Sequence, residues 1–250
     1  MPEKFEGIPR PQEGSDFDTK FSIKEPEHSK LELKFSNSDL KEIFGNKQFS
    51  PERLILLLER QYPSTYRQDV GVWEGYTLKK HTLMVMGQFE KYFGDKDLPS
   101  GIDKNIFRLF LALHDVGKPE AISRGGKHLQ YEYTRQYIQS LFEALGIDQR
   151  HTDLALVLAS GDPIGKYLTS RMDTIQTRTA IEQMANEAKM SVNEFFELLC
   201  IYYKLDAGSY TENAGGLRSL DDLFEFDEIN RNLNFAPHVQ SRINQLGFKK

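Results

Sequence analysis

The feature that most constrains the fold of this chain is an apolar run that leads directly into an adjacent histidine and aspartate. Residues 109–113 are all apolar, and His114 and Asp115 follow before Gly117 and Pro119. Such a run indicates a helix buried on nearly every side, and glycine and proline are typical of helix ends. The sequence therefore predicts that a buried helix presents an imidazole and a carboxylate in its last turn.

A buried pair of this kind needs a partner. An ionised carboxylate that is removed from water without compensation costs several kcal/mol or more. A divalent cation is the simplest partner that a carboxylate and an imidazole can share. The remaining ligands of such an ion would have to come from other buried helix faces.

Two further helices are expected to supply them. In residues 77–93, His81 lies at helical spacing from Leu78 and Val85, on the apolar side of the helix. In residues 192–206, Asp206 continues the same kind of apolar face. Taken singly, a core histidine is usually just hydrogen-bonded, and an aspartate at a helix end is usually exposed. Together with His114 and Asp115, the four groups favour a metal site, because each would otherwise need its own compensation.

The order His81, then His114-Asp115, then Asp206, on a helical scaffold, resembles the HD-domain superfamily of metal-dependent phosphohydrolases. The resemblance covers about residues 77–210. The segment HDVGKP at residues 114–119, followed by a basic glycine-rich stretch, is similar to the HD domains of some tRNA nucleotidyltransferases and of RNA-linked cyclic phosphodiesterases. Signatures of the alarmone hydrolases, the cyclic-di-nucleotide phosphodiesterases and the dNTP triphosphohydrolases are missing from the sequence.

This resemblance implies a metal-dependent hydrolase of phosphomonoesters or phosphodiesters, with a small phosphorylated substrate such as a nucleotide or an RNA terminus. His81, His114, Asp115 and Asp206 would bind the ion, and Mn²⁺, Co²⁺, Ni²⁺, Fe²⁺, Zn²⁺ and Mg²⁺ are all candidates. Asp115, Asp206 and Lys118 would be catalytic, with the base left open between the two carboxylates. Lys118 could instead be a solvated lysine that offsets a helix dipole.

Further substrate-binding candidates lie after the HD pair. They are Lys118, Arg124, Lys127, His128, Asp162 and Lys166. Arg124 and Lys127 flank two glycines whose amides could hold a phosphate, although an ordinary exposed turn has the same sequence. Two other readings stay open: a di-iron oxygenase of the HD type, with His128 and His151 as additional ligands, and a non-catalytic module that senses a nucleotide.

Composition limits the class of protein. The chain has 250 residues, 39% of them hydrophobic, a net charge of −5 and a single cysteine. These values are typical of a globular protein without a disulfide framework, and they argue against an extensive nucleic-acid surface. No apolar stretch reaches the roughly 18 residues that a membrane span needs, and the first residues lack an apolar signal core. We therefore expect a cytoplasmic protein without a membrane partner; the oligomeric state is left open.

The expected fold is all-α: an HD-type helical bundle over residues 49–250, with its motif core at 77–210, preceded by an irregular extension at 1–48. In the extension, residues 31–35 alternate and predict a short strand. Residues 100–103 predict a capping box for the helix that ends at the HD pair, and residues 119–127 predict a loop. The further helices are predicted at about 51–60, 77–93, 128–145, 148–159, 174–188 and 192–206, with weak ones at 218–224 and 237–246.

Overall fold

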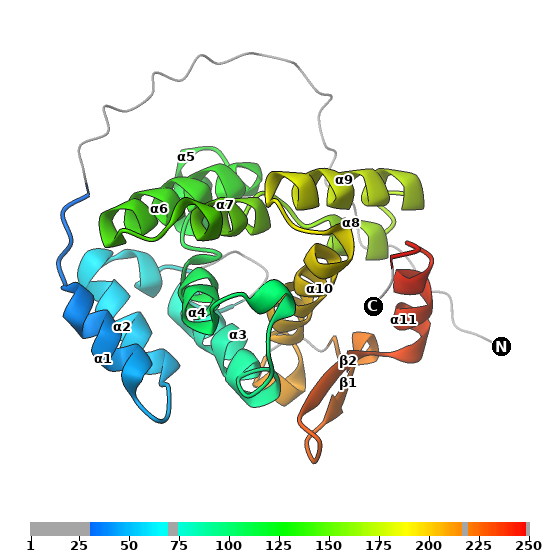
Figure 1. The fold of residues 1–250 in the computed structure, drawn as a ribbon, viewed down its shortest axis with the longest axis horizontal. Helices are drawn as coiled ribbons and strands as arrows, with labels where there is room; N and C mark the ends of the chain where they lie inside the picture. Colours follow the sequence, from blue (N-terminus) through cyan, green and yellow to red (C-terminus); the bar gives the residue numbers. More distant parts are fainter. Residues whose placement is uncertain (1–30, 70–74, 217–219, 249–250) are drawn as a thin grey trace. The chain divides into compact units, whose positions relative to one another are not determined.

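The computed structural model describes residues 31–69, 75–216 and 220–248, and this part of the chain is mostly helical (Figure 1). The all-α prediction is confirmed. The helices are α1 (Asn37–Gly45), α2 (Pro51–Gln61), α3 (Leu78–Tyr92), α4 (Lys104–Leu113), α5 (Lys118–Arg124), α6 (Gln130–Leu145), α7 (Gln149–Leu158), α8 (Pro163–Leu168), α9 (Thr174–Glu187), α10 (Val192–Gly208) and α11 (Pro237–Asn244). Strands β1 (Phe224–Asp227) and β2 (Asn232–Phe235) pair antiparallel.

Local capping explains where most of these helices begin. The side chains of Thr77, Asp148 and Ser191 each accept a hydrogen bond from the backbone N–H three residues later. Gly146 ends α6 in the left-handed conformation, with φ at 69°. These are the boundaries that the sequence predicted for the long helices, to within about two residues.

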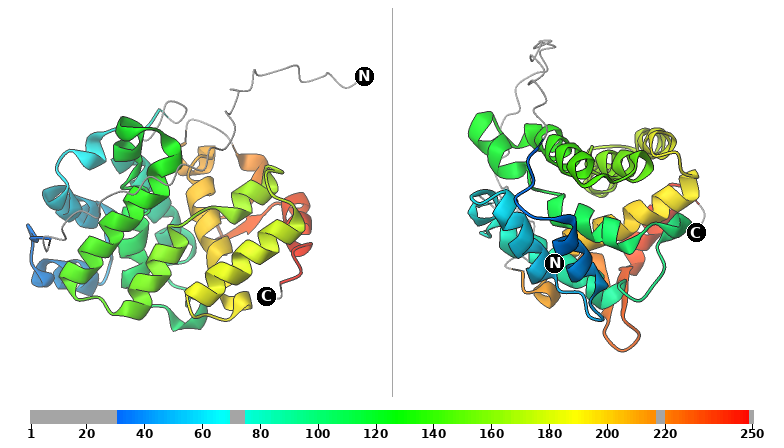
Figure 2. Two further views of the ribbon diagram at one scale, coloured as in Figure 1. Left: turned by 90° about the horizontal axis from the view of Figure 1, so that it is seen from above. Right: turned by 60° about the vertical axis from the view of Figure 1, so that its left-hand side comes forward.

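Helix α3 lies at the centre of the arrangement because it packs against both α4 and α10. Helices α6, α7 and α9 form a layer over α4 and α10, as the views in Figures 1 and 2 show. Fully buried phenylalanines fill the space where these elements meet: Phe89, Phe107, Phe110, Phe142 and Phe195. The three elements that carry the predicted ligands are thus held together by one continuous core.

The N-terminal part of this core differs from the prediction. Residues 1–30 lie outside the described residues, and a compact unit begins at Leu31, before the predicted boundary at residue 48. Residues 37–45, expected to be irregular, form α1, which begins with a capping box between Ser36 and Asp39. Residues 31–35 form no strand, because their backbone is paired with a side chain: the Gln61 amide accepts from Lys34 N–H at 2.8 Å and donates to the Glu32 carbonyl at 3.1 Å.

Two predictions around the HD pair are also wrong. Residues 119–124 of the predicted loop belong to α5, and Pro119 stands in its first turn, where the missing N–H costs nothing. The predicted cap at Ser100 does not form, since Ser100 has a left-handed backbone with φ at 54°. The side chain of Asp103 caps α4 instead, by accepting from the N–H groups of Asn105 and Ile106.

Near the C-terminus, the weak helix predicted at 218–224 does not form over its described residues, and β1 begins at its last residue, Phe224, which pairs with Phe235 of β2. Of the predicted segment, residues 218 and 219 lie outside the described residues, and only a short 3-10 turn at Asp221–Leu223 is helical. The second weak helix is confirmed as α11.

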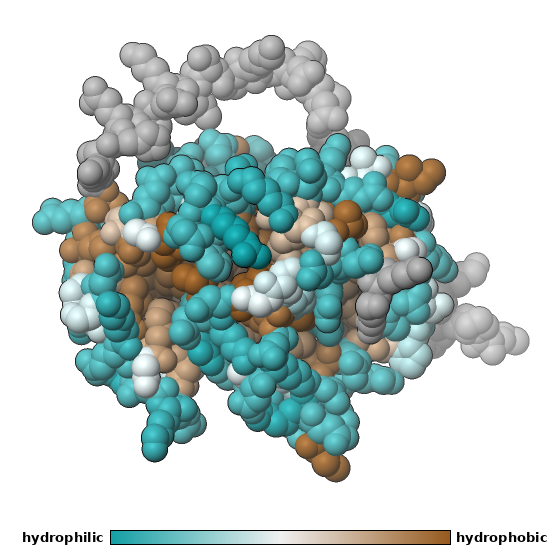
Figure 3. Space-filling model, in the orientation of Figure 1, coloured by the Kyte–Doolittle hydropathy of each residue, from teal (hydrophilic) through white to brown (hydrophobic). Residues whose placement is uncertain are grey.

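The surface shown in Figure 3 is largely hydrophilic, with apolar side chains visible in the hollows between helices. Large exposed apolar residues of the described chain are scattered rather than gathered: Leu56, Ile122, Ile175 and Ile229. No described helix has the length and apolar character that crossing a bilayer requires.

Candidate metal centre

Three elements bring the four predicted ligands into one cluster. His81 comes from α3, His114 and Asp115 follow α4, and Asp206 lies near the end of α10. One potential ligand atom from each residue lies within 4.8 Å of the others. The side chains of His81 and His114 are completely buried, whereas that of Asp206 keeps 38% of its exposure. The described part of the chain therefore contains a buried cluster that could hold a metal ion.

The end of α4 explains how two consecutive residues reach the same point. His114 is the last residue before a tight turn that leads directly into α5. Gly117 lies in this turn against α6, and its N–H donates to Thr134 Oγ1 at 3.2 Å. A Cβ on Gly117 would collide with the backbone at Tyr133 and Thr134. Glycine is therefore required for the close approach that turns Asp115 back beside His114.

Hydrogen bonds fix the orientation of both imidazoles. His114 Nδ1 lies 2.7 Å from the Leu111 carbonyl, which can only accept, so Nδ1 carries the proton. His81 Nδ1 lies 3.3 Å from Ser209 Oγ, whose own proton goes to the Asp206 carbonyl at 2.6 Å. His81 Nδ1 is therefore the donor of that pair. Both Nε2 atoms therefore face the cluster. Metal-binding histidines are held in the same way, with one ring nitrogen donating to an outer partner and the other facing the ion.

The inward-facing atoms need a positive charge between them. The two Nε2 atoms are 3.2 Å apart, so their lone pairs would repel unless a proton or a cation lay between them. His81 Nε2 lies 3.2 Å from both Asp115 Oδ2 and Asp206 Oδ1. Both oxygens are buried without a hydrogen bond of normal geometry, although Lys118 Nζ forms an ion pair with Asp115 Oδ2 at 2.6 Å. This donor set fits a divalent cation of the first transition series.

The pKa values follow from the same contacts. Burial lowers the pKa of His81, but the two neighbouring carboxylates outweigh it and raise this pKa to about 9. Burial also opposes ionisation of Asp115, yet Lys118 and His114 hold its pKa well below the usual range. The pKa of Asp206 is lowered by the two histidines beside it, again against burial. Without a metal ion, a proton on His81 therefore supplies the positive charge.

A cavity of about 410 Å³ opens beside the cluster, with Asp115 and Asp206 in its wall. Four of the predicted substrate-binding residues line it: Lys118, Lys127, Asp162 and Lys166. Lys118 is only 5% exposed, so it is not a solvated surface lysine. Asp162 caps α8 by accepting from Gly165 N–H at 2.7 Å, and burial raises the pKa of its carboxyl group.

The other candidates lie elsewhere among the described residues. Arg124 is exposed and pairs with Glu120 at 2.9 Å, beside a different hollow. His128 is exposed and does not line the cavity. His151 pairs with Asp148 at 2.7 Å, away from the cluster. The predicted phosphate loop therefore contributes only Lys127 to the cavity, and the extra ligands that a di-iron site would need are not contributed by His128 or His151.

Several lining residues are not marked by the sequence motifs. Four tyrosines and one arginine belong to this group: Tyr131, Tyr202, Tyr203, Tyr210 and Arg171. The position of Tyr202 one turn before Asp206, on the same helix face, was a usable signal. The ring of Tyr210 stacks on that of His81, with centroids 5.0 Å apart. Tyr131 and Arg171 have no local pattern that distinguishes them from surface residues.

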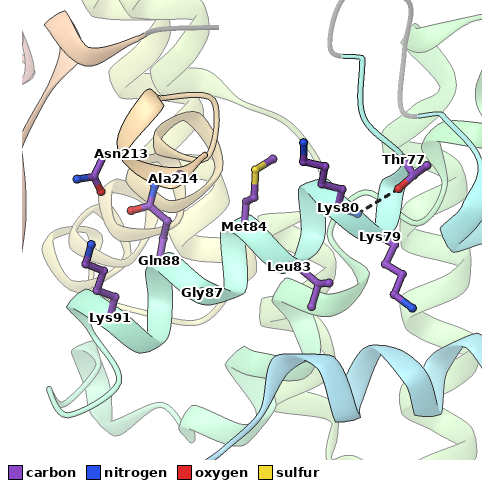
Figure 4. Close-up of a pocket in the computed structure, with 10 residues that line it drawn as sticks. All are labelled: Thr77, Lys79, Lys80, Leu83, Met84, Gly87, Gln88, Lys91, Asn213 and Ala214. Atoms are coloured by element: carbon purple, nitrogen blue, oxygen red, sulfur yellow. Dashed lines mark hydrogen bonds between the residues drawn. The ribbon is translucent and has the colours of Figure 1, made fainter. Parts of the chain in front are cut away.

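A second depression, of about 550 Å³, lies along the outer side of α3 and meets the 3-10 turn at Glu212–Ala214 (Figure 4). It contains none of the four ligands. Two of its lysines are neutralised, since Lys79 pairs with Glu59 at 2.8 Å and Lys91 with Glu228 at 2.7 Å. The metal-ligand cluster and the cations beside it make the first cavity the better candidate site.

Comparison of the chain with protein-family models, with curated proteins and with solved structures yields no significant match.

Proposed function

We propose that the protein is a metal-dependent phosphohydrolase of the HD type, which cleaves a phosphomonoester or phosphodiester of a nucleotide or an RNA terminus. The observation that carries the proposal is the convergence of four inward-facing ligand atoms within 4.8 Å, next to a cavity lined by cations. The likeness to the HD superfamily is an analogy of motif and fold class, so the function has to be argued from the site.

The ligand chemistry supports a divalent ion held by His81, His114, Asp115 and Asp206. Such an ion would polarise a phosphoryl oxygen and lower the pKa of a bound water toward about 7, so that hydroxide is available at neutral pH. Two imidazoles with two carboxylates suit Mn²⁺, Fe²⁺, Co²⁺, Ni²⁺ or Zn²⁺ better than Mg²⁺, which prefers oxygen ligands. Ser209 and the Leu111 carbonyl keep the two imidazoles in the tautomer that binding requires.

The remaining steps are assigned to side chains of this chain. In the hydrolysis, the oxygen of water forms a bond to phosphorus, the ester P–O bond breaks, and the leaving oxygen takes a proton. Asp115 and Asp206 are the carboxylates positioned to accept the proton of the attacking water. Lys118, with Nζ 2.6 Å from Asp115 Oδ2, is placed to stabilise negative charge that develops on the phosphoryl oxygens.

A hydrolysis screen tests this function. The full chain is incubated with each divalent metal and with p-nitrophenyl phosphate, 2′,3′-cyclic nucleotides and mononucleotides. We expect turnover with at least one metal, and a loss of at least about a hundredfold in kcat for Lys118→Ala. The double variant His114→Ala/Asp115→Ala should abolish turnover. Hydrolysis that persists unchanged in the double variant, or absence of turnover with every metal and substrate, contradicts the proposal.

A further inference from the structure

The cations of the main cavity come from three parts of the chain: α5, the 3-10 turn at Lys127–Leu129, and the end of α8 with the turn that follows it. Lys118, on α5, is engaged with Asp115 at the metal cluster. Lys166 and Arg171 come from the end of α8 and the turn that follows it. Neither Lys166 nor Arg171 forms a direct ion pair with a carboxylate of the described residues. Both act electrostatically on the carboxyl group of Asp162 in the same wall, and both can also contact a ligand in the cavity.

The turn after α8 holds these two side chains in a defined place. The N–H of Arg171 donates to the Lys166 carbonyl at 2.8 Å, and Ser170 between them has a left-handed backbone with φ at 58°. Arg171 Nε donates to Thr169 Oγ1 at 3.1 Å, and that hydroxyl donates to the Gly165 carbonyl at 2.6 Å. The guanidinium is thus fixed through Nε, which leaves its terminal nitrogens for an anion.

The charge of the cavity is larger than one phosphate monoester requires. Four cationic side chains and three carboxylates line it, an excess of one positive charge that a bound divalent ion would raise to three. A phosphomonoester near neutral pH carries about two negative charges. An excess of positive charge therefore remains after the scissile phosphate is bound. Lys166 and Arg171 both interact with the carboxyl group of Asp162, so two positive charges are set against one negative charge at this wall.

The rest of the lining suits a nucleoside. A cavity of about 410 Å³ falls within the range that small-molecule sites occupy. Tyr131, Tyr202, Tyr203 and Tyr210 line it, and nucleobases of any kind stack favourably on aromatic rings. The cavity thus offers separate sites for a phosphate, a base and a second anion.

We propose that the substrate is a nucleotide with phosphate groups at two different positions, such as a nucleoside 3′,5′-bisphosphate. One phosphate lies at the metal cluster beside Lys118, and the second is bound by Lys166 and Arg171. This inference rests on the proposed hydrolase function and names its substrate class. It makes Lys166 and Arg171 specificity-determining residues that act through the second phosphate.

The test compares adenosine 3′,5′-bisphosphate with adenosine 5′-monophosphate as substrates of the full chain. We expect wild-type kcat/KM to be at least about tenfold higher for the bisphosphate, the gain that one charge-assisted contact provides. Lys166→Ala/Arg171→Ala should remove this preference, mainly by raising KM for the bisphosphate. Arg135→Ala, which removes an exposed arginine on α6, is the matched control and should retain it. Equal kcat/KM for the two nucleotides in the wild type, or a preference that survives in the double variant, overturns the inference.

A binding measurement separates this inference from the hydrolase proposal. Calorimetric titration of the Mn²⁺-loaded protein with adenosine 3′,5′-bisphosphate should show binding that weakens at least about tenfold in Lys166→Ala/Arg171→Ala. If p-nitrophenyl phosphate is hydrolysed but the bisphosphate binds no better than the monophosphate, the inference fails and the hydrolase function stands. If the bisphosphate binds as expected and no phosphoester is hydrolysed, the hydrolase function fails.

Discussion

At the scale of single residues, the hydrogen bonds behind the ligands are as informative as the ligands themselves. Ser209 accepts from His81 Nδ1 and donates to the Asp206 carbonyl, so that one hydroxyl links two of the four ligand residues. Ligands held in this way bind metal more tightly, because their side chains are already oriented before the ion binds. The sequence offered no sign of this role, since a serine three residues after Asp206 has no motif of its own.

Removing the Ser209 hydroxyl should therefore weaken metal binding. We expect Ser209→Ala to lower the affinity for Mn²⁺ or Zn²⁺ by about 10–100-fold, the usual effect of losing an outer-shell partner. Ser160→Ala is the matched control, because its Oγ also donates to a backbone carbonyl, that of Val157, which belongs to none of the four ligand residues. An equal affinity loss in both variants would show that the effect is general destabilisation.

The affinity for metal should also depend on pH through His81. In the metal-free protein its pKa is raised to about 9, so the proton must leave before Nε2 can bind an ion. Affinity is therefore expected to rise about tenfold per pH unit from pH 7 to 9 and to level off above that, where the proton is already gone. Mn²⁺ titrations at pH 7, 8 and 9 measure this slope. A constant affinity over the range contradicts the assigned protonation of His81.

At the scale of elements, the junction between α4 and α5 decides the geometry of the site. The sequence identified the residues at this junction but not its shape, because glycine and proline are found both where helices end and where they begin. The sequence predicts that Pro119 ends a helix, whereas it lies in the first turn of α5. Only the packing of Gly117 against α6 shows why the chain turns there.

Substitution of this glycine should be costly for that reason. Gly117→Ala places a methyl group into the backbone of α6, and we expect a loss of about 1–3 kcal/mol in unfolding free energy, measured by urea denaturation. Gly87→Ala on α3 is the control: its Cβ would meet no atom within 4 Å, so the change should stabilise by about 0.5–1 kcal/mol. Similar unfolding free energies for the two variants would contradict the close approach at Gly117.

The start of α4 provides a second test at this scale. Because Asp103 and not Ser100 caps the helix, Asp103→Ala should cost about 1 kcal/mol in unfolding free energy. Ser100→Gly should be neutral or stabilising, since glycine adopts the left-handed backbone at φ 54° without strain. Thermal denaturation compares the two variants. A larger loss of stability for Ser100→Gly than for Asp103→Ala would favour Ser100 as the cap, as the sequence predicted.

The missed hairpin has a different cause. Its strands have four residues each, and the turn between Asp227 and Asn232 contains no glycine or Asn-Gly pair. Strands this short show too few alternations to be distinguished from a weak helix, and the pairing of Phe224 with Phe235 is a tertiary feature. The long helices, by contrast, carry enough periodic positions and caps to be predicted from the sequence.

At the scale of the whole described chain, the cluster of four ligands could be predicted and the cavity could not. His81, His114, Asp115 and Asp206 each lie on a recognisable buried face, so their convergence required only that the helices pack together. The cavity wall combines residues of α5, α6, α8 and α10, and their relative placement depends on every helix contact between them. The sequence consequently predicts Arg124 and His128 at the site although both lie outside the cavity, and no motif marks Arg171, which lines it.

The central claim is that this cluster holds a divalent ion, and direct metal analysis tests it. The full chain is equilibrated with Mn²⁺ or Zn²⁺, freed of unbound metal and measured by elemental analysis beside His114→Ala/Asp115→Ala. We predict at least one ion per chain in the wild type, loss of that ion in the double variant, and its retention in His151→Ala, which removes a histidine outside the cluster. No bound ion in the wild type, or an equal metal content in the double variant, would contradict the account.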